Sequence, residues 1–300
     1  MGEKQVSMRQ IARECGCSLA TVSYVLNHSG QARISSATRL RVIETAMRLN
    51  YSPLRDPRRR PGRAVILVSA VPGQGAGRRA ALMDLAGELT RQLALRDIPA
   101  VVLELEGLAG QWRQVQKLAP GVLFMLDRGS GGVGHLDPPC VQPIVFVDSD
   151  NDDPLYYKVL PDYPSLLDRA ARLLGEPAPF LVLEGVRCGA LLRTITGSTP
   201  PEDVYLHVDR GLQDFLARHR GRKGVVVGDL LAVEACRSFP AEDLAVISAL
   251  DRPELFPPEL TVLSVPNRDR AAAAAEVAMG LMNLELDAGH SHRVLLQARG

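Results

Sequence analysis

The chain has 300 residues, of which 46% are hydrophobic, and this is enough for about two domains with sizeable cores. Its formal net charge of +1 conceals an asymmetry, because residues 1–63 contain 12 Lys and Arg but 4 Asp and Glu, against 23 and 30 in the rest. A basic head on an acidic body indicates a polyanionic partner for the head alone. Since no apolar run approaches the roughly 20 residues of a membrane span and no secretory signal opens the chain, a membrane protein is excluded and we expect a cytoplasmic one.

The cysteine usage argues against a disulfide framework and against a metal site. The five cysteines are scattered and odd in number, and no C-x-x-C pair recurs at metal-binding spacing: they are Cys15, Cys17, Cys140, Cys188 and Cys236. We expect Cys15 and Cys17 to be a buried small residue and a turn residue. The protein is therefore expected to be reduced, with no metal and no cofactor.

The beginning of the chain predicts two short helices joined by a tight turn. Ser7 and Gln10 have the spacing of a capping box, which starts a helix over residues 8–15. Gly16 can adopt the left-handed conformation that ends a helix, and Ser18 can cap a second helix directly after it. This second helix carries an apolar stripe at Val22, Val25 and Leu26. A helix, a turn containing glycine and a second helix form the helix-turn-helix arrangement, which places its second helix in the DNA major groove.

A third helix is predicted after a polar loop. Ser35 is a suitable N-cap for a helix over residues 36–49, whose apolar stripe is Leu40, Ile43 and Met47. Three short helices with so few apolar residues make a small core. We therefore expect the head to depend on DNA, or on a second copy of the chain, for full order.

Four segments of the head carry a specific pattern of residues. They are RQIARECGCSLATVSYVLN at 9–27, Ile-Ser at 34–35, Thr-Arg at 38–39 and LNYSP at 49–53. Together they resemble the lactose-repressor (LacI) family of bacterial transcription regulators. The resemblance implies a homodimer that binds a double-stranded DNA operator, commonly as a repressor, and that a small-molecule effector can gate. The loop at 28–33 is longer than the common family form, so no DNA contact is transferred to it.

The resemblance also implies which side chains read DNA. Leu19, Ala20 and Tyr24 stand at positions of the second helix that face base edges in the family. Leucine and alanine cannot hydrogen-bond a base and can only pack against thymine methyl groups, so Tyr24 is the one polar reader of the three. The alternative is that Tyr24 merely packs on the helix surface. Phosphate contacts that fix the docking register are expected from Ser18, Thr21, Ser23, Asn27 and Arg39.

Residues 52–63 form a segment rich in proline and arginine. In the family this stretch is a hinge helix whose leucine enters the minor groove of the operator, but the corresponding positions here hold Pro57 and Arg60. Pro57 removes an interior helix hydrogen bond, and residues before prolines are pushed away from helical angles, so we expect no such helix. We expect an extended basic arm on phosphates or in a narrow minor groove, formed by Arg55, Arg58, Arg59 and Arg60. The alternative is a plain interdomain linker.

Beyond the arm, apolar β-rich runs alternate with helical patterns, which predicts parallel sheets covered by helices on both faces. Strands are expected at 64–70, 99–105, 121–126, 143–148, 180–184, 224–228, 244–248 and 293–297. Helices are expected from Leu82 to Leu93 and over 111–118, 165–174, 211–219, 231–238 and 268–286. The order of elements resembles the two-subdomain, doubly wound, periplasmic-binding-protein-like effector domain of the same family. The predicted fold class is α/β, with an all-α helix-turn-helix head at 1–51, the arm at 52–63 and an effector and dimerisation body at 64–300.

In such a body a ligand binds between the two halves, at the carboxyl ends of the strands. The resemblance gives three candidate effector contacts, Asp229, Asp251 and Gln74. The transfer is incomplete, because Gly228 stands where the family has a polar residue and residues 249–250 lack the first acid of a family motif. The sequence leaves two alternatives open, an unusual effector or none.

Two other classes of protein fit parts of the sequence. The run Gly-Gln-Gly-Ala-Gly at 73–77 is similar to a dinucleotide-binding loop of a nucleotide-dependent enzyme, but Arg78 stands where that pattern needs glycine. His290 and His292 have no cysteine or carboxylate cluster beside them, so they do not predict a metal site. We expect no enzyme and no catalytic residues. The other class is a ligand-independent architectural DNA-binding protein whose body serves only to dimerise.

Overall fold

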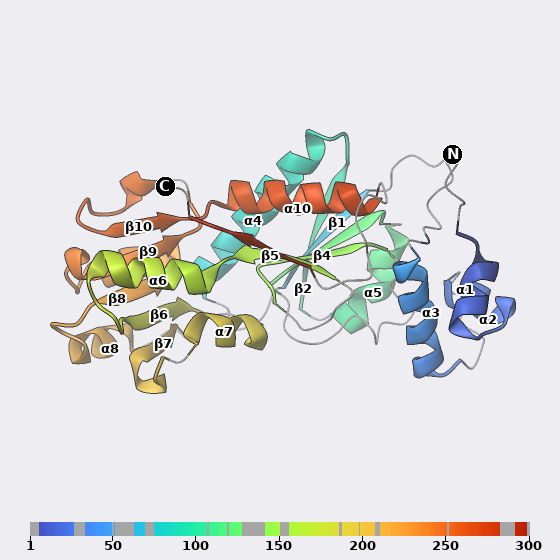
Figure 1. Cartoon of the computed structure of the whole chain (residues 1–300). Coiled ribbons are helices and arrows are strands. Elements are labelled where there is room, and N and C mark those ends of the chain that lie inside the picture. The colour runs from blue at the N-terminus through green and yellow to red at the C-terminus, as the bar shows by residue number, and fades with distance from the viewer. Residues whose placement is uncertain are drawn as a thin grey trace.

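The computed structural model describes a helical head attached to a longer α/β body (Figure 1). The residues that it describes are 6–26, 34–49, 51, 63–69, 75–106, 108–118, 120–127, 142–150, 156–185, 188–197, 199–207, 211–250, 252–282 and 292–298. Within them, two parallel sheets flanked by helices follow the three helices of the head, which confirms the predicted fold class. No helix in these ranges is long and apolar enough to pass through a membrane.

The head contains α1 (Met8–Cys15), α2 (Leu19–Leu26) and α3 (Ser36–Arg48), close to the predicted bounds. As predicted, the Ser7 hydroxyl accepts a hydrogen bond from the backbone N–H of Gln10 at 3.3 Å, and Gly16 ends α1 in the left-handed conformation. The core of the head combines buried apolar side chains of all three helices: Ile11, Ala12, Cys15, Val22, Val25, Leu26, Val42, Ile43 and Ala46.

The first subdomain is a six-stranded parallel sheet in the order β11-β5-β4-β3-β1-β2. Its strands are β1 (Ala64–Ser69), β2 (Ala100–Leu105), β3 (Val122–Leu126), β4 (Ile144–Val147), β5 (Tyr157–Pro161) and β11 (His292–Leu296). The helices α4 (Ala76–Ala94) and α10 (Asn267–Met282) pack together on one face, and α5 (Leu108–Lys117) covers the other with Trp112. The inner strands β1, β3 and β4 are buried on both faces, which explains why they read as nearly continuous hydrophobic runs.

The second subdomain is a five-stranded parallel sheet in the order β10-β9-β8-β6-β7. Its strands are β6 (Phe180–Glu184), β7 (Val204–His207), β8 (Gly224–Val227), β9 (Leu244–Ser248) and β10 (Thr261–Ser264). One face packs against α6 (Tyr163–Leu174) and α7 (Gly189–Thr196), and the other against α8 (Leu212–Arg218) and α9 (Asp229–Ala235). Short 3-10 turns lie at Pro201–Asp203, Ala241–Asp243 and Pro253–Leu255.

The chain passes between the two subdomains more than once. It leaves the first sheet after β5, returns from β10 through α10, and adds β11 to the edge of the first sheet beside β5 (Figure 1). Four elements carried no clear sequence signal and were not predicted: β5, α7, β7 and β10. The interior of β5 holds the fully buried Lys158, and α7 contains glycine and two threonines, so neither shows a clean apolar period.

Candidate functional site

The outer face of α2 presents the three predicted base-reading side chains. Leu19 and Tyr24 are 43% and 47% exposed, and Ala20 is exposed beside them. The opposite face of the same helix is buried in the head through Val22 and Val25. Because no other part of the head covers Leu19, Ala20 or Tyr24 among the described residues, this face of α2 is accessible to an external partner.

The predicted phosphate-contacting residues lie at the start of α2 and around it. Ser18 Oγ accepts a hydrogen bond from the backbone N–H of Thr21 at 3.0 Å and lies 2.8 Å from Thr21 Oγ1, so Ser18 also caps the helix. Ser23 is half-buried on α2. Asn27 and the side chain of Arg39 lie outside the described residues. Ser18 and Thr21 are thus brought next to the reading face.

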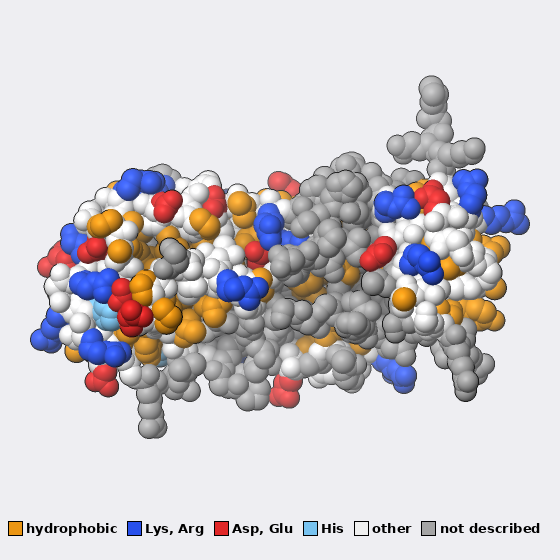
Figure 2. Space-filling view, turned by 60° about the horizontal axis from the view of Figure 1, so that its bottom comes forward, with side chains coloured by type: hydrophobic (Ala, Val, Ile, Leu, Met, Phe, Trp, Pro, Cys, Tyr) orange, Lys and Arg blue, Asp and Glu red, His pale blue; other side chains and the backbone are white. Residues whose placement is uncertain are grey.

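The described surface of the head is basic. Figure 2 shows Lys and Arg side chains spread over it, and Arg9, Arg13 and Arg41 are exposed. Arg48 is also exposed, but its guanidinium donates a 2.8 Å hydrogen bond to the carboxylate of Glu14. Outside the described residues lie the four predicted arm residues, Arg55, Arg58, Arg59 and Arg60.

A second site lies at the carboxyl ends of the strands, where a buried charge cluster is centred on Asp148. Its Oδ2 accepts hydrogen bonds from Arg270 Nη1 at 2.7 Å and from Arg78 Nη1 at 3.2 Å. Arg78 Nε donates to Asp127 at 3.2 Å. Burial alone would raise the pKa of Asp148, but the guanidinium groups of Arg270 and Arg78 outweigh it and hold that pKa below its ordinary value.

Local backbone geometry places the two carboxylates of this cluster. Asp127 follows β3 and Asp148 follows β4, and both adopt left-handed backbone conformations, with φ of 49° and 52°. Aspartate tolerates this conformation better than most residues because its short side chain can hydrogen-bond locally. The chain turns sharply after each of these two strands, so the carboxylates face α4 and α10.

The second subdomain contributes carboxyl groups of its own to the same region. Asp229, at the start of α9, accepts hydrogen bonds from Ser248 Oγ and from the backbone N–H of Ala249, the latter at 3.1 Å. Glu184 ends β6 and is almost fully buried. Burial raises the pKa of Glu184 to about 7; the charge of Arg78 opposes this shift and that of Asp229 adds to it.

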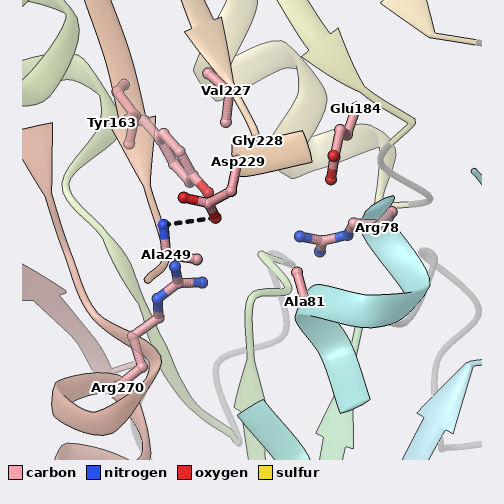
Figure 3. Close-up of a pocket in the computed structure, with 10 residues that line it drawn as sticks. Arg78, Ala81, Tyr163, Glu184, Val227, Gly228, Asp229, Ala249 and Arg270 are labelled. Atoms are coloured by element: carbon pink, nitrogen blue, oxygen red, sulfur yellow. Dashed lines mark hydrogen bonds between the residues drawn. The ribbon is translucent and has the colours of Figure 1, made fainter. Parts of the chain in front are cut away.

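Side chains from both subdomains line a small cavity between them (Figure 3). Among the described residues this cavity has a volume of about 30 Å³ and is lined by Arg78, Ala81, Tyr163, Glu184, Val227, Gly228, Asp229, Ile247, Ala249 and Arg270. Such a volume holds about one water molecule. Burial raises the pKa of Tyr163, so its hydroxyl is a protonated hydrogen-bond donor here.

One of the three predicted effector contacts, Asp229, lies in this cleft. The others, Asp251 and Gln74, lie outside the described residues. The cleft residues that the sequence did not point out are Arg78, Asp127, Asp148, Tyr163, Glu184 and Arg270. A signal for the acidic ones was present, because a carboxylate closes or directly follows three of the buried strands. Among the described residues, no group of three or more His, Cys, Asp or Glu side chains is arranged to hold a metal ion.

The geometry of the head defines its class, a helix-turn-helix domain with an exposed face on its second helix. Residues 7–53 match the family described as "Bacterial regulatory proteins, lacI family". The similarity to this family model is confined to the head and to the first two residues after it.

A curated relative extends the likeness beyond the head. The chain is 30% identical over 142 residues to the HTH-type transcriptional regulator GalR of Lacticaseibacillus casei, an alignment that covers 47% of this chain and 42% of the relative. The chain thus spans less than half the length of the curated relative that it matches. The relatives found are transcriptional regulators and not enzymes.

Solved structures share the fold of the whole chain. The lac repressor dimer bound to operator and the anti-inducer ONPF is 16% identical, with a TM-score of 0.57 over 99% of this chain and 98% of that one. The transcriptional regulator CelR in complex with cellobiose is 17% identical, with a TM-score of 0.59 over 98% of each chain. A LacI family regulator from Arthrobacter sp. FB24 in complex with lactose is 17% identical, with a TM-score of 0.56 over 79% of this chain and 97% of that one. At these identities the likeness establishes the two-subdomain fold.

The charge cluster predicts a large effect of Asp148→Asn on stability. The substitution leaves Arg78 and Arg270 buried without their shared carboxylate, and breaking a buried ion pair in this way costs about 3–5 kcal/mol of unfolding free energy. Urea unfolding of the body measures this loss. Asp168→Asn on the exposed face of α6 is the matched control and is expected to leave the midpoint unchanged. A midpoint for Asp148→Asn equal to that of the control contradicts the role assigned to the cluster.

Proposed function

We propose that this protein is a sequence-specific DNA-binding transcriptional regulator of the cytoplasm, acting as a repressor on a pseudopalindromic operator. The observation that carries the proposal is the exposed face of α2, with Leu19, Ala20 and Tyr24 outward and the capping Ser18 and Thr21 beside them. The match of residues 7–53 to the lacI family and the basic surface of the head support DNA as the polyanionic partner. The regulator named GalR supports regulation as the biological role.

The proposed assembly is a homodimer, with the head at 1–51, the arm at 52–63 and the dimerising body at 64–300. A single head of three short helices covers too little DNA for tight specific binding, and paired heads match the two halves of a pseudopalindrome. The similar lac repressor structure is a dimer on its operator. Sedimentation analysis of the free protein measures this state directly.

The proposed readout of sequence is largely apolar. Leu19 and Ala20 pack against thymine methyl groups, and Tyr24 supplies the one hydroxyl able to bond a base edge. Ser18, Thr21, Ser23, Asn27 and Arg39 are proposed to bond phosphate oxygens and to fix the register of α2 in the groove. With so little hydrogen-bonded readout, DNA shape carries more of the specificity.

The arm is proposed to supply much of the remaining affinity. Its prolines prevent the family's hinge helix, and its arginines suit phosphates or a narrow minor groove, where the negative potential attracts them. In this arrangement Arg55, Arg58, Arg59 and Arg60 bind as an extended segment and contribute a strongly salt-dependent term.

We propose that a small-molecule effector of this protein enters the cleft that contains Asp229. Asp251 and Gln74 are proposed to border the same cleft. CelR is bound to cellobiose and the lac repressor to the anti-inducer ONPF in the similar structures. The cavity that the described residues around Asp229 enclose has about 30 Å³, so a sugar-sized molecule fits at this place only if the residues around it move apart. This observation favours a second candidate, a ligand-independent DNA-binding protein, and the two differ in whether any small molecule changes operator affinity. An enzymatic role is not proposed.

Tyr24→Ala tests the reading role of the exposed face. Genomic footprinting first recovers the operator. The variant is then expected to lose about 1–3 kcal/mol of binding to the operator and much less on random DNA, because a base contact is lost while phosphate contacts remain. Fluorescence anisotropy at fixed salt measures both affinities, and Leu95→Ala on the exposed surface of the body is the control that changes neither. Equal weakening on operator and random DNA contradicts the assignment of Tyr24 as a reader.

Replacing Arg55, Arg58, Arg59 and Arg60 by glutamine tests the arm. Loss of about four phosphate contacts is expected to reduce the slope of log K against log salt by roughly 4 per chain. Affinity measured at a series of salt concentrations gives the slope for the wild type and the variant. An unchanged slope and affinity shows that the segment is only a linker.

A further inference from the structure

The Glu184 side chain lies where the two subdomains touch. Its carboxyl group fits between two glycines, Gly77 on α4 of the first subdomain and Gly228 before α9 of the second. A Cβ atom added to Gly77 would lie 2.2 Å from Glu184 Oε1, and one added to Gly228 would lie 2.5 Å from Glu184 Cδ. Any larger residue at either position would therefore overlap this carboxyl group.

Neighbouring contacts across the cleft involve the same first turn of α4. A Cβ atom on Gly77 would also lie 3.3 Å from Leu230, and one on Gly75 would lie 3.5 Å from the ring of His207. Glu184 therefore occupies the centre of the contact between α4 and the second subdomain. The Glu184 side chain also lines the cavity of about 30 Å³ that the described residues enclose.

The groups that face Glu184 come from every element packed around it. Arg78 is on α4, Asp229 and the backbone N–H of Leu231 are on α9, and His207 pairs with Glu184 in register on β7. Tyr163 of α6 and Arg270 of α10 line the same cavity. Arg78 and Arg270 form ion pairs with Asp127 and Asp148, and Arg78 Nη2 is buried without a hydrogen-bond partner. Among the described residues, neither guanidinium group forms an ion pair with Glu184.

We propose that the Glu184 side chain lies inside the cleft and holds the two subdomains closed while its carboxyl group carries a proton. When that group ionises, the two subdomains separate. The body then responds to pH at the contact between its two subdomains. The conformational part of this inference stands on the body alone, and its consequence for operator affinity rests on the proposed function.

The direction of the effect follows from proton linkage. Burial raises the pKa of Glu184 to about 7 in the closed cleft, from an ordinary value of 4.5 that applies once the cleft opens to water. Because the closed state has the higher pKa, closure is favoured below that pKa and loses its support as the pH rises through about 7. The ratio of closed to open molecules is expected to fall about tenfold between pH 6 and pH 8.5.

Hydrogen–deuterium exchange on the full-length protein without DNA tests the inference. At pH 6 and pH 8.5, the peptides that cover the first turns of α4 and α9 are compared with the peptide that covers β1. After correction for intrinsic rates, these peptides are expected to exchange about tenfold faster at the higher pH in the wild type, with β1 unchanged. Glu184→Gln keeps the shape of the protonated side chain and is expected to stay protected at both pH values. The exposed Glu202→Gln is the matched control and is expected to follow the wild type.

Gly77→Ala provides an independent test, because its methyl group takes the space of the Glu184 carboxyl group. It is expected to lose protection in these two peptides at both pH values while β1 stays protected. The inference is overturned if wild type and Glu184→Gln show the same exchange at both pH values, or if Gly77→Ala keeps the cleft protected. Operator binding is measured separately, so pH-independent closure in a protein that binds its operator refutes this inference and leaves the proposed function intact.

Discussion

The body of this protein depends on one buried interaction, the carboxylate of Asp148 shared between Arg78 and Arg270. Two guanidinium groups and two aspartates are removed from water at the carboxyl edge of the first sheet, and each is costly to bury unless it is paired. The pairing fixes the start of α4 and the start of α10 against the same sheet edge. Since α4 also contacts the second subdomain, the cluster determines what the cleft between the subdomains can contain.

The head and the body differ in which side chains they expose and which they bury. The head turns an apolar and hydroxyl-bearing surface outward on α2, where the proposed DNA partner can reach it, and its small core is formed by three helices. The body turns polar groups inward, so that carboxylates of both subdomains meet the guanidinium groups of Arg78 and Arg270 around a small cavity. The exposed face of α2 suits the proposed DNA partner, and a ligand that enters at this cavity has to work against the protein's own contacts.

The sequence predicted best what depends on neighbours in the chain. The cap at Ser7 and the left-handed Gly16 are local signals, and the helices of the head appear where they were expected. Most strands were found because burial on both faces makes them apolar throughout. The pattern of apolar residues did not predict β5, where Lys158 is buried inside the strand. It also did not predict α7, which is short and has no regular apolar face.

The charge cluster in the cleft could not be predicted because its members are far apart in the sequence. Arg78 and Asp148 are separated by 70 positions, and Asp148 and Arg270 by 122. Only the strand order brings them to one edge, and the sequence does not state that order. Asp229 was found through the family resemblance and lies in the cleft, whereas the role of Glu184 becomes visible only when the glycines around it are placed.

We infer that the Glu184 side chain lies in the contact between the two subdomains and holds the body closed. A crystal structure of the free full-length protein, grown at about pH 6, tests this inference most directly because closure is then at its most favourable. We expect the Glu184 carboxyl group between Gly77 and Gly228, with no other molecule in the cleft. An open cleft at that pH, or a copurified small molecule in the place of the Glu184 side chain, would contradict the inference.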